Sequence, residues 1–289
     1  MGWKYNIQEK LATVLGVEVV VDNYSYVGGG SINETFKITT NKGPFFVKKN
    51  SATRFPGMFE KEATGISLLG DSKEIEVPNI VAVGQGSNDA FLILDFINSG
   101  SKSSLFWSKF GAQLASMHKH TTESFGLDHD NYIGSLYQRN KKHNNWCDFF
   151  REERLQYQVK MARDSGSVNS SDIQSFERFY KELDSIFPKE PPSLLHGDLW
   201  SGNFMVNQDG QPVIIDPAVY YGHREMDLGM TQLFGGFDQQ FYESYNYSFP
   251  LEKGWKERIQ YCNLYPLLVH VNLFGGGYVN SVRSVISRF

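Results

Sequence analysis

The sequence predicts an α+β protein with a small N-terminal sheet and a larger, mainly helical C-terminal part. In the first third, runs rich in β-branched and aromatic residues alternate with turns of Gly, Asn and Pro. From about Ser101 the apolar residues recur at helical spacing instead. No repeat, low-complexity tract or flexible linker interrupts the 289 residues. We therefore expect a bilobal molecule, residues 1–97 and 98–289, whose default binding site is the cleft between the lobes.

The N-terminal lobe is expected to be a five-stranded antiparallel sheet with one helix. A helix is predicted near residues 58–69, because Phe59, Ala63, Ile66 and Leu69 share one helical face. The strand-like runs lie before and after this helix, at residues 17–27, 34–40, 45–50, 79–83 and 90–96.

The C-terminal lobe is expected to be mainly α-helical. Two short apolar runs, residues 193–200 and 211–217, are bounded by turn residues and predict buried strands around a loop. The amphipathic stretches that predict helices cover residues 104–120, 146–163, 170–183 and 255–274.

Composition and charge exclude several classes of function. The formal net charge of -4 argues against a broad basic surface for nucleic acid. The two cysteines, Cys147 and Cys262, are too few for a disulfide framework, which suits a reducing cytosol, and we expect both to be buried. The N-terminus lacks an apolar signal core, and no apolar run is long enough to span a bilayer. We expect a cytoplasmic protein without membrane or nucleic-acid partners, either a monomer or a weak homodimer.

The strongest chemical signal is the segment that runs from His196 to Asn203, HGDLWSGN, followed by Asp216 at the end of the next apolar run. Asn203 and Asp216 offer the oxygen ligands that Mg²⁺ prefers. Asp198 would act as the base that accepts the proton of an attacking hydroxyl. Each residue alone could be an ordinary turn residue. Together, however, they reproduce the spacing of a kinase catalytic loop and its metal-binding Asp. His196 is expected to support this loop and is given no catalytic role.

A second constellation lies upstream, in the order that kinases require. Lys48 closes the third strand-like run, and the next helix carries Glu62. In kinases a strand lysine holds the nucleotide phosphates and a helix glutamate orients it. Glu60 is the alternative partner on the same helix.

Two further segments would complete a nucleotide site. The glycine-rich turn with Gly29, Gly30 and Ser31 falls between the first two strands, where backbone N–H groups could approach phosphates. The run that contains Leu94, Asp95 and Phe96 occupies the place of the kinase hinge, whose backbone would bind an adenine. A plain hairpin turn and a plain core strand remain alternatives for these two segments. ATP and Mg²⁺ are the cofactors predicted.

The motifs LLHGDLWSGN, IIDPA and YGHREMDLGM, in that order, resemble the fructosamine-3-kinase (ketosamine-3-kinase) family. This family lies within the aminoglycoside-phosphotransferase and choline-kinase superfamily, which has a protein-kinase-like fold. The resemblance covers nearly the whole chain, including GGGSINETF, WCDFFREERL and HVNLFGGGY. Many family members carry Cys where this chain has Ser31, so a redox switch at that position is not expected. Within GHREMD, Asp227 is expected to brace the catalytic loop.

The resemblance implies ATP-dependent phosphorylation of the 3-hydroxyl of a ketosamine, either a small molecule or protein-bound, which leads to deglycation. It also implies that Asp198 is the base, that Asn203 and Asp216 hold Mg²⁺, that Lys48 contacts phosphate, and that Trp200 lines the sugar pocket. A plain packing role is the alternative for Trp200. Two alternatives stay open. One is another small-molecule kinase, of the aminoglycoside or choline type, and the other is a non-catalytic kinase-like binding module.

Overall fold

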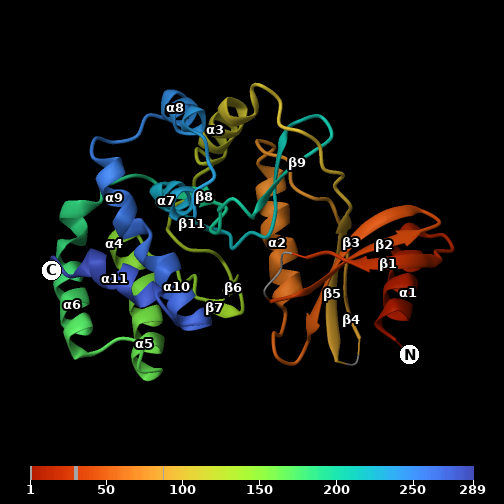
Figure 1. The fold of residues 1–289 in the computed structure, drawn as a ribbon, viewed down its shortest axis with the longest axis horizontal. Coiled ribbons are helices and arrows are strands. Elements are labelled where there is room, and N and C mark those ends of the chain that lie inside the picture. Colours follow the sequence, from red (N-terminus) through yellow and green to blue (C-terminus); the bar gives the residue numbers. More distant parts are fainter. Residues whose placement is uncertain (1, 29–31, 87) are drawn as a thin grey trace. The chain divides into compact units, whose positions relative to one another are not determined.

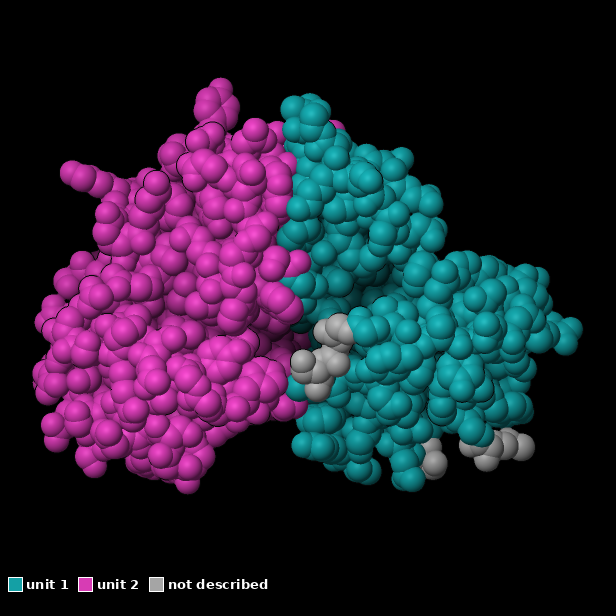
Figure 2. All heavy atoms as spheres, viewed as in Figure 1, with its two compact units in different colours: residues 1–106, 202–217 teal, residues 107–201, 218–289 magenta. Residues whose placement is uncertain are grey.

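The computed structural model describes residues 2–28, 32–86 and 88–289. The chain divides into two compact units, coloured separately in Figure 2. Unit 1 comprises residues 1–106 and 202–217, and unit 2 comprises residues 107–201 and 218–289. This division differs from the expected boundary at residue 97, because the segment 202–217 belongs to the N-terminal unit despite its place in the sequence.

Unit 1 contains the predicted five-stranded antiparallel sheet, in the order β1-β2-β3-β5-β4 (Figure 1). The helix expected near residues 58–69 is α2, and α1 is a further helix that the sequence analysis did not predict. The elements of the first part of this unit are α1 (Trp3–Leu15), β1 (Val21–Tyr26), β2 (Glu34–Thr40), β3 (Gly43–Ser51), α2 (Met58–Asp71), β4 (Ile80–Gln85) and β5 (Asp89–Asp95).

Alternation along β5 gives the sheet two buried faces, because successive side chains of a strand point to opposite sides. Phe91 and Ile93 belong to one hydrophobic cluster, which includes Ile7 and Leu11 of α1. Leu92 and Leu94 belong to the other, which includes residues of α2. The sheet is therefore covered by a helix on each face.

The C-terminal segment of unit 1 is a hairpin of β9 (Phe204–Val206) and β10 (Pro212–Ile214). Its strands pair in the register Phe204 opposite Ile214. The backbone N–H of Ile214 donates to the carbonyl of Glu76, over 3.0 Å, and the N–H of Gly100 donates to the carbonyl of Val206. These hydrogen bonds fix the hairpin to the segments before and after β4 and β5.

Unit 2 is mainly helical, as predicted, and the stretch expected as one helix over residues 146–163 has a π-helical centre. Two short antiparallel strand pairs complete the unit, β6 (Asn131–Ile133) with β7 (Leu136–Gln138) and β8 (Ser193–Leu195) with β11 (Tyr220–Gly222). The helices are α3 (Phe106–Met117, whose first residue lies in unit 1), α4 (Trp146–Phe149), the π-helix (Phe150–Gln156), α5 (Tyr157–Asp164), α6 (Ser170–Ile186), α7 (Glu225–Leu233), α8 (Gln239–Ser248), α9 (Trp255–Cys262), α10 (Leu264–Phe274) and α11 (Tyr278–Ile286). Within the described part of the chain, none of the helices is both long and apolar enough to cross a membrane.

Asp227 on α7 holds the start of the loop that follows β8, which confirms the bracing role expected for it. Its carboxylate accepts hydrogen bonds from the backbone N–H groups of His196, at 2.8 Å, and Gly197, at 2.9 Å. His118 lies 3.1 Å from the same carboxylate through Nε2, and its Nδ1 contacts the hydroxyl of Tyr245 at 2.8 Å. Asp227 is almost fully buried, so these contacts replace its hydration.

Burial alone would raise the pKa of Asp227. The pKa is nevertheless lowered, because the hydrogen bond and charge of His118 favour the carboxylate, as do the charge of His196 and the N–H of Gly197. A folded-state pKa below the unfolded value means that ionised Asp227 stabilises the fold above about pH 4, and that this contribution is lost as the pH falls through the folded-state value.

We predict that Asp227→Asn lowers the free energy of unfolding by roughly 2–3 kcal/mol at neutral pH, because an amide cannot accept both backbone N–H groups. The difference from wild type should shrink below about pH 4, where the wild-type carboxylate also becomes protonated. Urea unfolding of both proteins across this range measures the difference, and the exposed Glu177→Gln is the control. If the difference in the free energy of unfolding between the two proteins does not change with pH, ionised Asp227 does not stabilise the fold.

Candidate active site

Lys48 forms two ion pairs inside unit 1. Its Nζ lies 2.6 Å from Oε1 of Glu62 and 2.6 Å from Oδ1 of Asp216. Lys48 is on β3, Glu62 is on α2, and Asp216 follows β10. The side chain of Lys48 is only 3% exposed, against 42% for Asp216. The structure thus joins three predicted site residues, and it selects Glu62 over Glu60, which is exposed.

The charges of these groups depend on one another. Burial lowers the pKa of Lys48, but the carboxylates of Asp216 and Glu62 outweigh burial and raise it well above the ordinary lysine value. Burial raises the pKa of Glu62, and the charge of Lys48 offsets only part of that effect. Lys48 therefore stays a cation at neutral pH, and the carboxylate of Asp216 is the more exposed of its two partners.

The β9–β10 hairpin brings Asn203 and Asp216 to one end of the same unit. The register places Asn203 opposite Ile215, and the N–H of Ile215 donates to the carbonyl of Asn203 over 3.0 Å. Asp216 is the next residue, with a φ of 57°. This left-handed conformation is uncommon outside glycine, although Asp tolerates it better than most residues, and strained backbone of this kind gathers at functional sites.

A cavity of about 330 Å³ adjoins these residues and lies entirely within unit 1. It includes the predicted hinge residues Leu94, Asp95 and Phe96 together with Asn203 and Asp216. The lining residues that the sequence analysis missed include Val27, Thr35, Phe46, Pro78, Met205 and Ile215. A small cavity with apolar walls and polar groups at one end is the usual form of a cofactor site.

The phosphate-contacting turn predicted at Gly29, Gly30 and Ser31 lies outside the described residues. The preceding Gly28 lines the cavity. The role given to the turn therefore stays a prediction.

In unit 2, the loop after β8 positions Asp198. Gly197 has a φ of 83°, and a Cβ atom there would lie 2.1 Å from the carbonyl oxygen of Ala218, so only glycine fits. The N–H of Asp198 donates to Nδ1 of His196, at 3.2 Å, and the N–H of Ala218 donates to the carbonyl of His196. His196 is fully buried and acts here as a support, as predicted.

Trp200 begins a chain of aromatic contacts in unit 2. Its ring lies 5.9 Å from that of Phe234, which lies 5.0 Å from the ring of His270. His270 in turn contacts the rings of Phe274 and Tyr278. Phe234 and Phe274 are 40% and 53% exposed, so the chain forms an accessible aromatic surface. Phe234 and His270 were not among the predicted site residues, and the one sequence signal for His270 is its position among aromatic residues on the last long apolar stretch.

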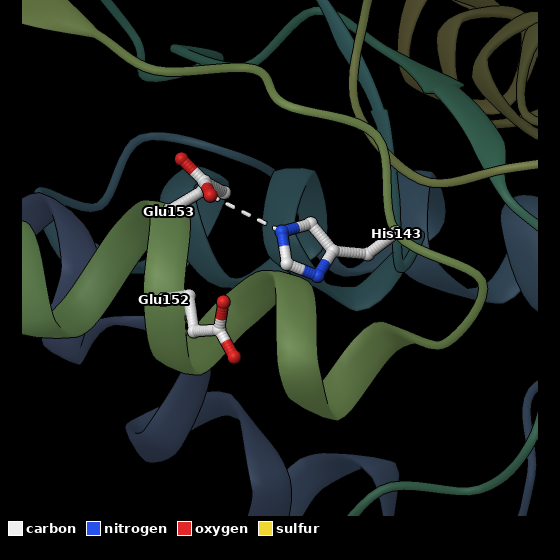
Figure 3. A group of neighbouring side chains, drawn as sticks. All are labelled: His143, Glu152 and Glu153. Carbon is white, nitrogen blue, oxygen red and sulfur yellow. Dashed lines mark hydrogen bonds and ion pairs between the residues drawn. The ribbon is translucent and has the colours of Figure 1, made fainter.

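A second group of possible metal ligands lies elsewhere in unit 2. His143, Glu152 and Glu153 place one ligand atom each within 4.8 Å of one another (Figure 3). However, Glu153 already contacts His143 and Arg139, each at 3.1 Å, and Glu152 contacts Arg151 at 3.0 Å. The guanidinium groups of Arg139 and Arg151 already pair with these carboxylates, so the group belongs to an ion-pair cluster on the π-helix.

Both cysteines are buried and free, as predicted. Burial is the main reason that the pKa of Cys147 is raised to about 12. The pKa of Cys262 is raised for the same reason. Thiols that stay protonated are poor nucleophiles, so neither cysteine joins the site.

Comparison with known proteins identifies the family of this chain. The family model described as "Fructosamine kinase" matches residues 3–289. A protein of Enterococcus faecium named "Probable ketoamine kinase" is 40% identical over 265 residues, which cover 91% of this chain and 94% of that protein. The chloroplastic protein-ribulosamine 3-kinase of Arabidopsis thaliana is 39% identical over 269 residues, 91% of this chain and 81% of that protein.

Solved structures agree with this assignment. A crystal structure described as a "putative fructosamine-3-kinase" from Thermobifida fusca has a TM-score of 0.86 and 34% identity, and the match covers 98% of this chain and 99% of that one. The aminoglycoside phosphotransferase APH(4)-Ia, at 15% identity and a TM-score of 0.60 over 98% of both chains, shares the fold, which confirms the protein-kinase-like class. The family model, the relatives and the Lys48–Glu62–Asp216 arrangement lead to one conclusion: the chain belongs to the fructosamine kinase family, whose members are ATP-dependent kinases that act on a hydroxyl group.

Proposed function

We propose that this protein transfers the γ-phosphoryl group of Mg-ATP to the 3-hydroxyl of a ketosamine. The observation that carries the proposal is the buried Lys48 held by both Glu62 and Asp216, since a cation fixed in this way beside a cavity is suited to nucleotide phosphates. The names of the ketoamine and ribulosamine kinases among the relatives support the ketosamine as acceptor.

The nucleotide would occupy the cavity of unit 1. Leu94, Phe46 and Met205 offer apolar surface for a base, and the backbone near Asp95 and Phe96 offers hydrogen bonds to its edge. Lys48 would then hold phosphate oxygens, while Glu62 keeps the ammonium group oriented.

Mg²⁺ fits the donor set of Asn203 and Asp216. An amide oxygen and a carboxylate are hard ligands, and Mg²⁺ completes its shell with water and substrate phosphate oxygens. Asp216 is 42% exposed at the side chain, so an ion can reach it. When bound, the ion would neutralise charge that develops on the phosphate oxygens during transfer.

Asp198 would receive the proton of the acceptor hydroxyl. In this step the hydroxyl oxygen forms a bond to the γ-phosphorus, and the bond from that phosphorus to the bridging oxygen of ADP breaks. The hydroxyl proton passes to the carboxylate of Asp198. The Asp227 contacts hold the backbone of His196 and Gly197, the two residues that precede Asp198.

The acceptor sugar would lie against the aromatic surface of Trp200, Phe234 and His270. The rings of Trp200 and His270 are suited to this role, since each offers an apolar face and a polar edge to a ligand with both properties, and Phe234 adds apolar surface between them. The imidazole Nδ1 of His270 lies 2.7 Å from the carbonyl of Pro266, which fixes the ring. Burial lowers the pKa of His270, so the ring is neutral at pH 7.

Choline or an aminoglycoside as acceptor is the less favoured alternative, because the APH-type structures resemble this chain in fold only. A non-catalytic module is weaker still, since Lys48, Asp198, Asn203 and Asp216 are all present. We propose a cytoplasmic location, which agrees with two buried free thiols.

We predict that Asp198→Ala and Asp216→Ala fail in different ways. Loss of the base should lower kcat by at least about 10²-fold and leave Mg-ATP affinity nearly unchanged. Loss of the metal ligand should weaken Mg-ATP binding as well as the rate. Isothermal titration calorimetry with Mg-ATP and single-turnover assays measure the two effects, with the exposed Asp209→Ala as control. If Asp198→Ala keeps near-normal turnover, Asp198 is not the base.

We also predict that ribulosamine or fructosamine adducts are phosphorylated far better than choline or aminoglycosides. A pocket that hydrogen-bonds the hydroxyls of a ketosamine rejects choline, which has a single hydroxyl, and aminoglycosides, whose hydroxyls are arranged differently, because its polar groups would be left unpaired. ADP release across the panel gives kcat/KM, and phosphorus NMR locates the phosphate. If choline or an aminoglycoside gives the highest kcat/KM, or if the phosphate lies on another hydroxyl, the ketosamine assignment fails while the kinase assignment survives.

A further inference from the structure

A second cavity, of about 630 Å³, lies in unit 2 between the end of α7, helix α8 and the start of α9 (helices labelled in Figure 1). It is lined by side chains that have no part in the phosphoryl transfer proposed above. Those that carry the argument are Gln232, Gln239, Tyr242, Glu243, Asn246 and Trp255. Its volume falls in the range of small-molecule sites.

The walls combine aromatic rings with hydrogen-bonding groups. Tyr242 and Trp255 lie with their rings 6.3 Å apart and only 27° from parallel, so together they form one aromatic wall. The side chains of Gln232, Gln239 and Asn246 each carry an amide, which can donate and accept hydrogen bonds at once. A ligand that suits this lining has an apolar face and several groups that are both donors and acceptors.

The charges in the cavity balance. Glu243 supplies one carboxylate, and Lys256 supplies one ammonium group. A nucleotide or other polyanion would meet too little positive charge here, and an ammonium compound would meet Lys256 beside the aromatic wall that otherwise suits it. The lining therefore favours a ligand without net charge.

Several of these groups are already oriented. The hydroxyl of Tyr242 lies 3.0 Å from that of Thr231, and Oδ1 of Asn246 accepts from the N–H of Leu251 at 2.8 Å. Nε2 of Gln239 donates to Oε1 of Glu243 at 3.3 Å. Because these contacts restrict the side chains, less conformational entropy is lost when a ligand binds.

We propose that this cavity binds a neutral carbohydrate, with one sugar ring against Tyr242 and Trp255 and its hydroxyls on Glu243 and the amide side chains. The site is separate from the acceptor site of the proposed kinase reaction. The two sites share one segment of chain, since Gly235 and Phe237 line this cavity while Phe234 contacts Trp200.

The test is a binding experiment without ATP, so that it does not depend on the kinase activity. Two-dimensional NMR of the ¹⁵N-labelled protein follows the indole N–H signal of Trp255, assigned by its absence in Trp255→Phe. The probes are D-ribose, D-fructose and D-glucose, with choline and glutamate as charged compounds. We expect at least one sugar to shift the Trp255 signal in a saturable manner, and neither charged compound to do so.

Two variants locate the binding. Trp255→Ala and Glu243→Leu should each raise the sugar Kd at least about tenfold, which is the usual effect of removing an aromatic or charged anchor. Because Trp255→Ala lacks the indole signal, its sugar binding is followed by saturation-transfer NMR. Tyr247→Ala, on the same helix but 91% exposed and outside the cavity, should bind as wild type. Circular dichroism checks that each variant is folded.

The proposal is overturned if no sugar shifts the Trp255 signal, if choline shifts it more than any sugar, or if Glu243→Leu binds as wild type. None of these outcomes bears on the ketosamine kinase proposal, which the substrate panel tests separately.

Discussion

The ammonium group of Lys48 is buried, and a buried charge must be paired within the protein. Two carboxylates do this, one from α2 and one from the end of the β9–β10 hairpin. The pair with Asp216, together with backbone hydrogen bonds, ties residues 202–217 to the N-terminal unit, although more than ninety residues of unit 2 precede them. One ion-pair cluster thus joins the sheet, its helix and a distant hairpin, and its member Asp216 lines the cavity.

This arrangement is poorly explained by stability alone. A buried ion pair gains little over well-packed apolar residues, because desolvation of both charges is costly. Three ionised groups that share one site raise that cost, and the raised pKa of Glu62 reflects it. The arrangement becomes reasonable if the charge of Lys48 is needed by a phosphate, and if Asp216 exchanges its contact with Lys48 for a metal ion. The unusual backbone of Asp216 agrees with a functional requirement.

Much of this site could be predicted from the sequence, because its signals are local. The order Lys48, Glu62, Asp198, Asn203, Asp216 follows a known pattern, and the helical period of Phe59, Ala63, Ile66 and Leu69 places α2 correctly. The sequence also favoured Glu62 over Glu60 as the partner of Lys48. Only the structure decides between them, because the partner depends on how α2 packs against β3.

Other features have no clear local signal. Helix α1 was missed because only two of its residues, Ile7 and Leu11, are buried, and because its N-cap, Gly2, has no side chain that could cap the helix. The π-helix over Phe150–Gln156 has no sequence signature. The aromatic contacts of Trp200, Phe234 and His270 join segments far apart in the sequence, so tertiary packing alone reveals them. The cavity of α7, α8 and α9 depends on how three successive helices pack, which the sequence pattern does not give.

The account rests on Asp216 and Asn203 as the metal ligands of a nucleotide complex. The most direct test is a crystal structure with a non-hydrolysable ATP analogue and Mn²⁺ in place of Mg²⁺, in which anomalous scattering locates the ion. The account predicts one strong peak coordinated by Asp216 and Asn203, with Lys48 on a phosphate. A nucleotide complex with the ion elsewhere, for example at His143, Glu152 and Glu153, would contradict it.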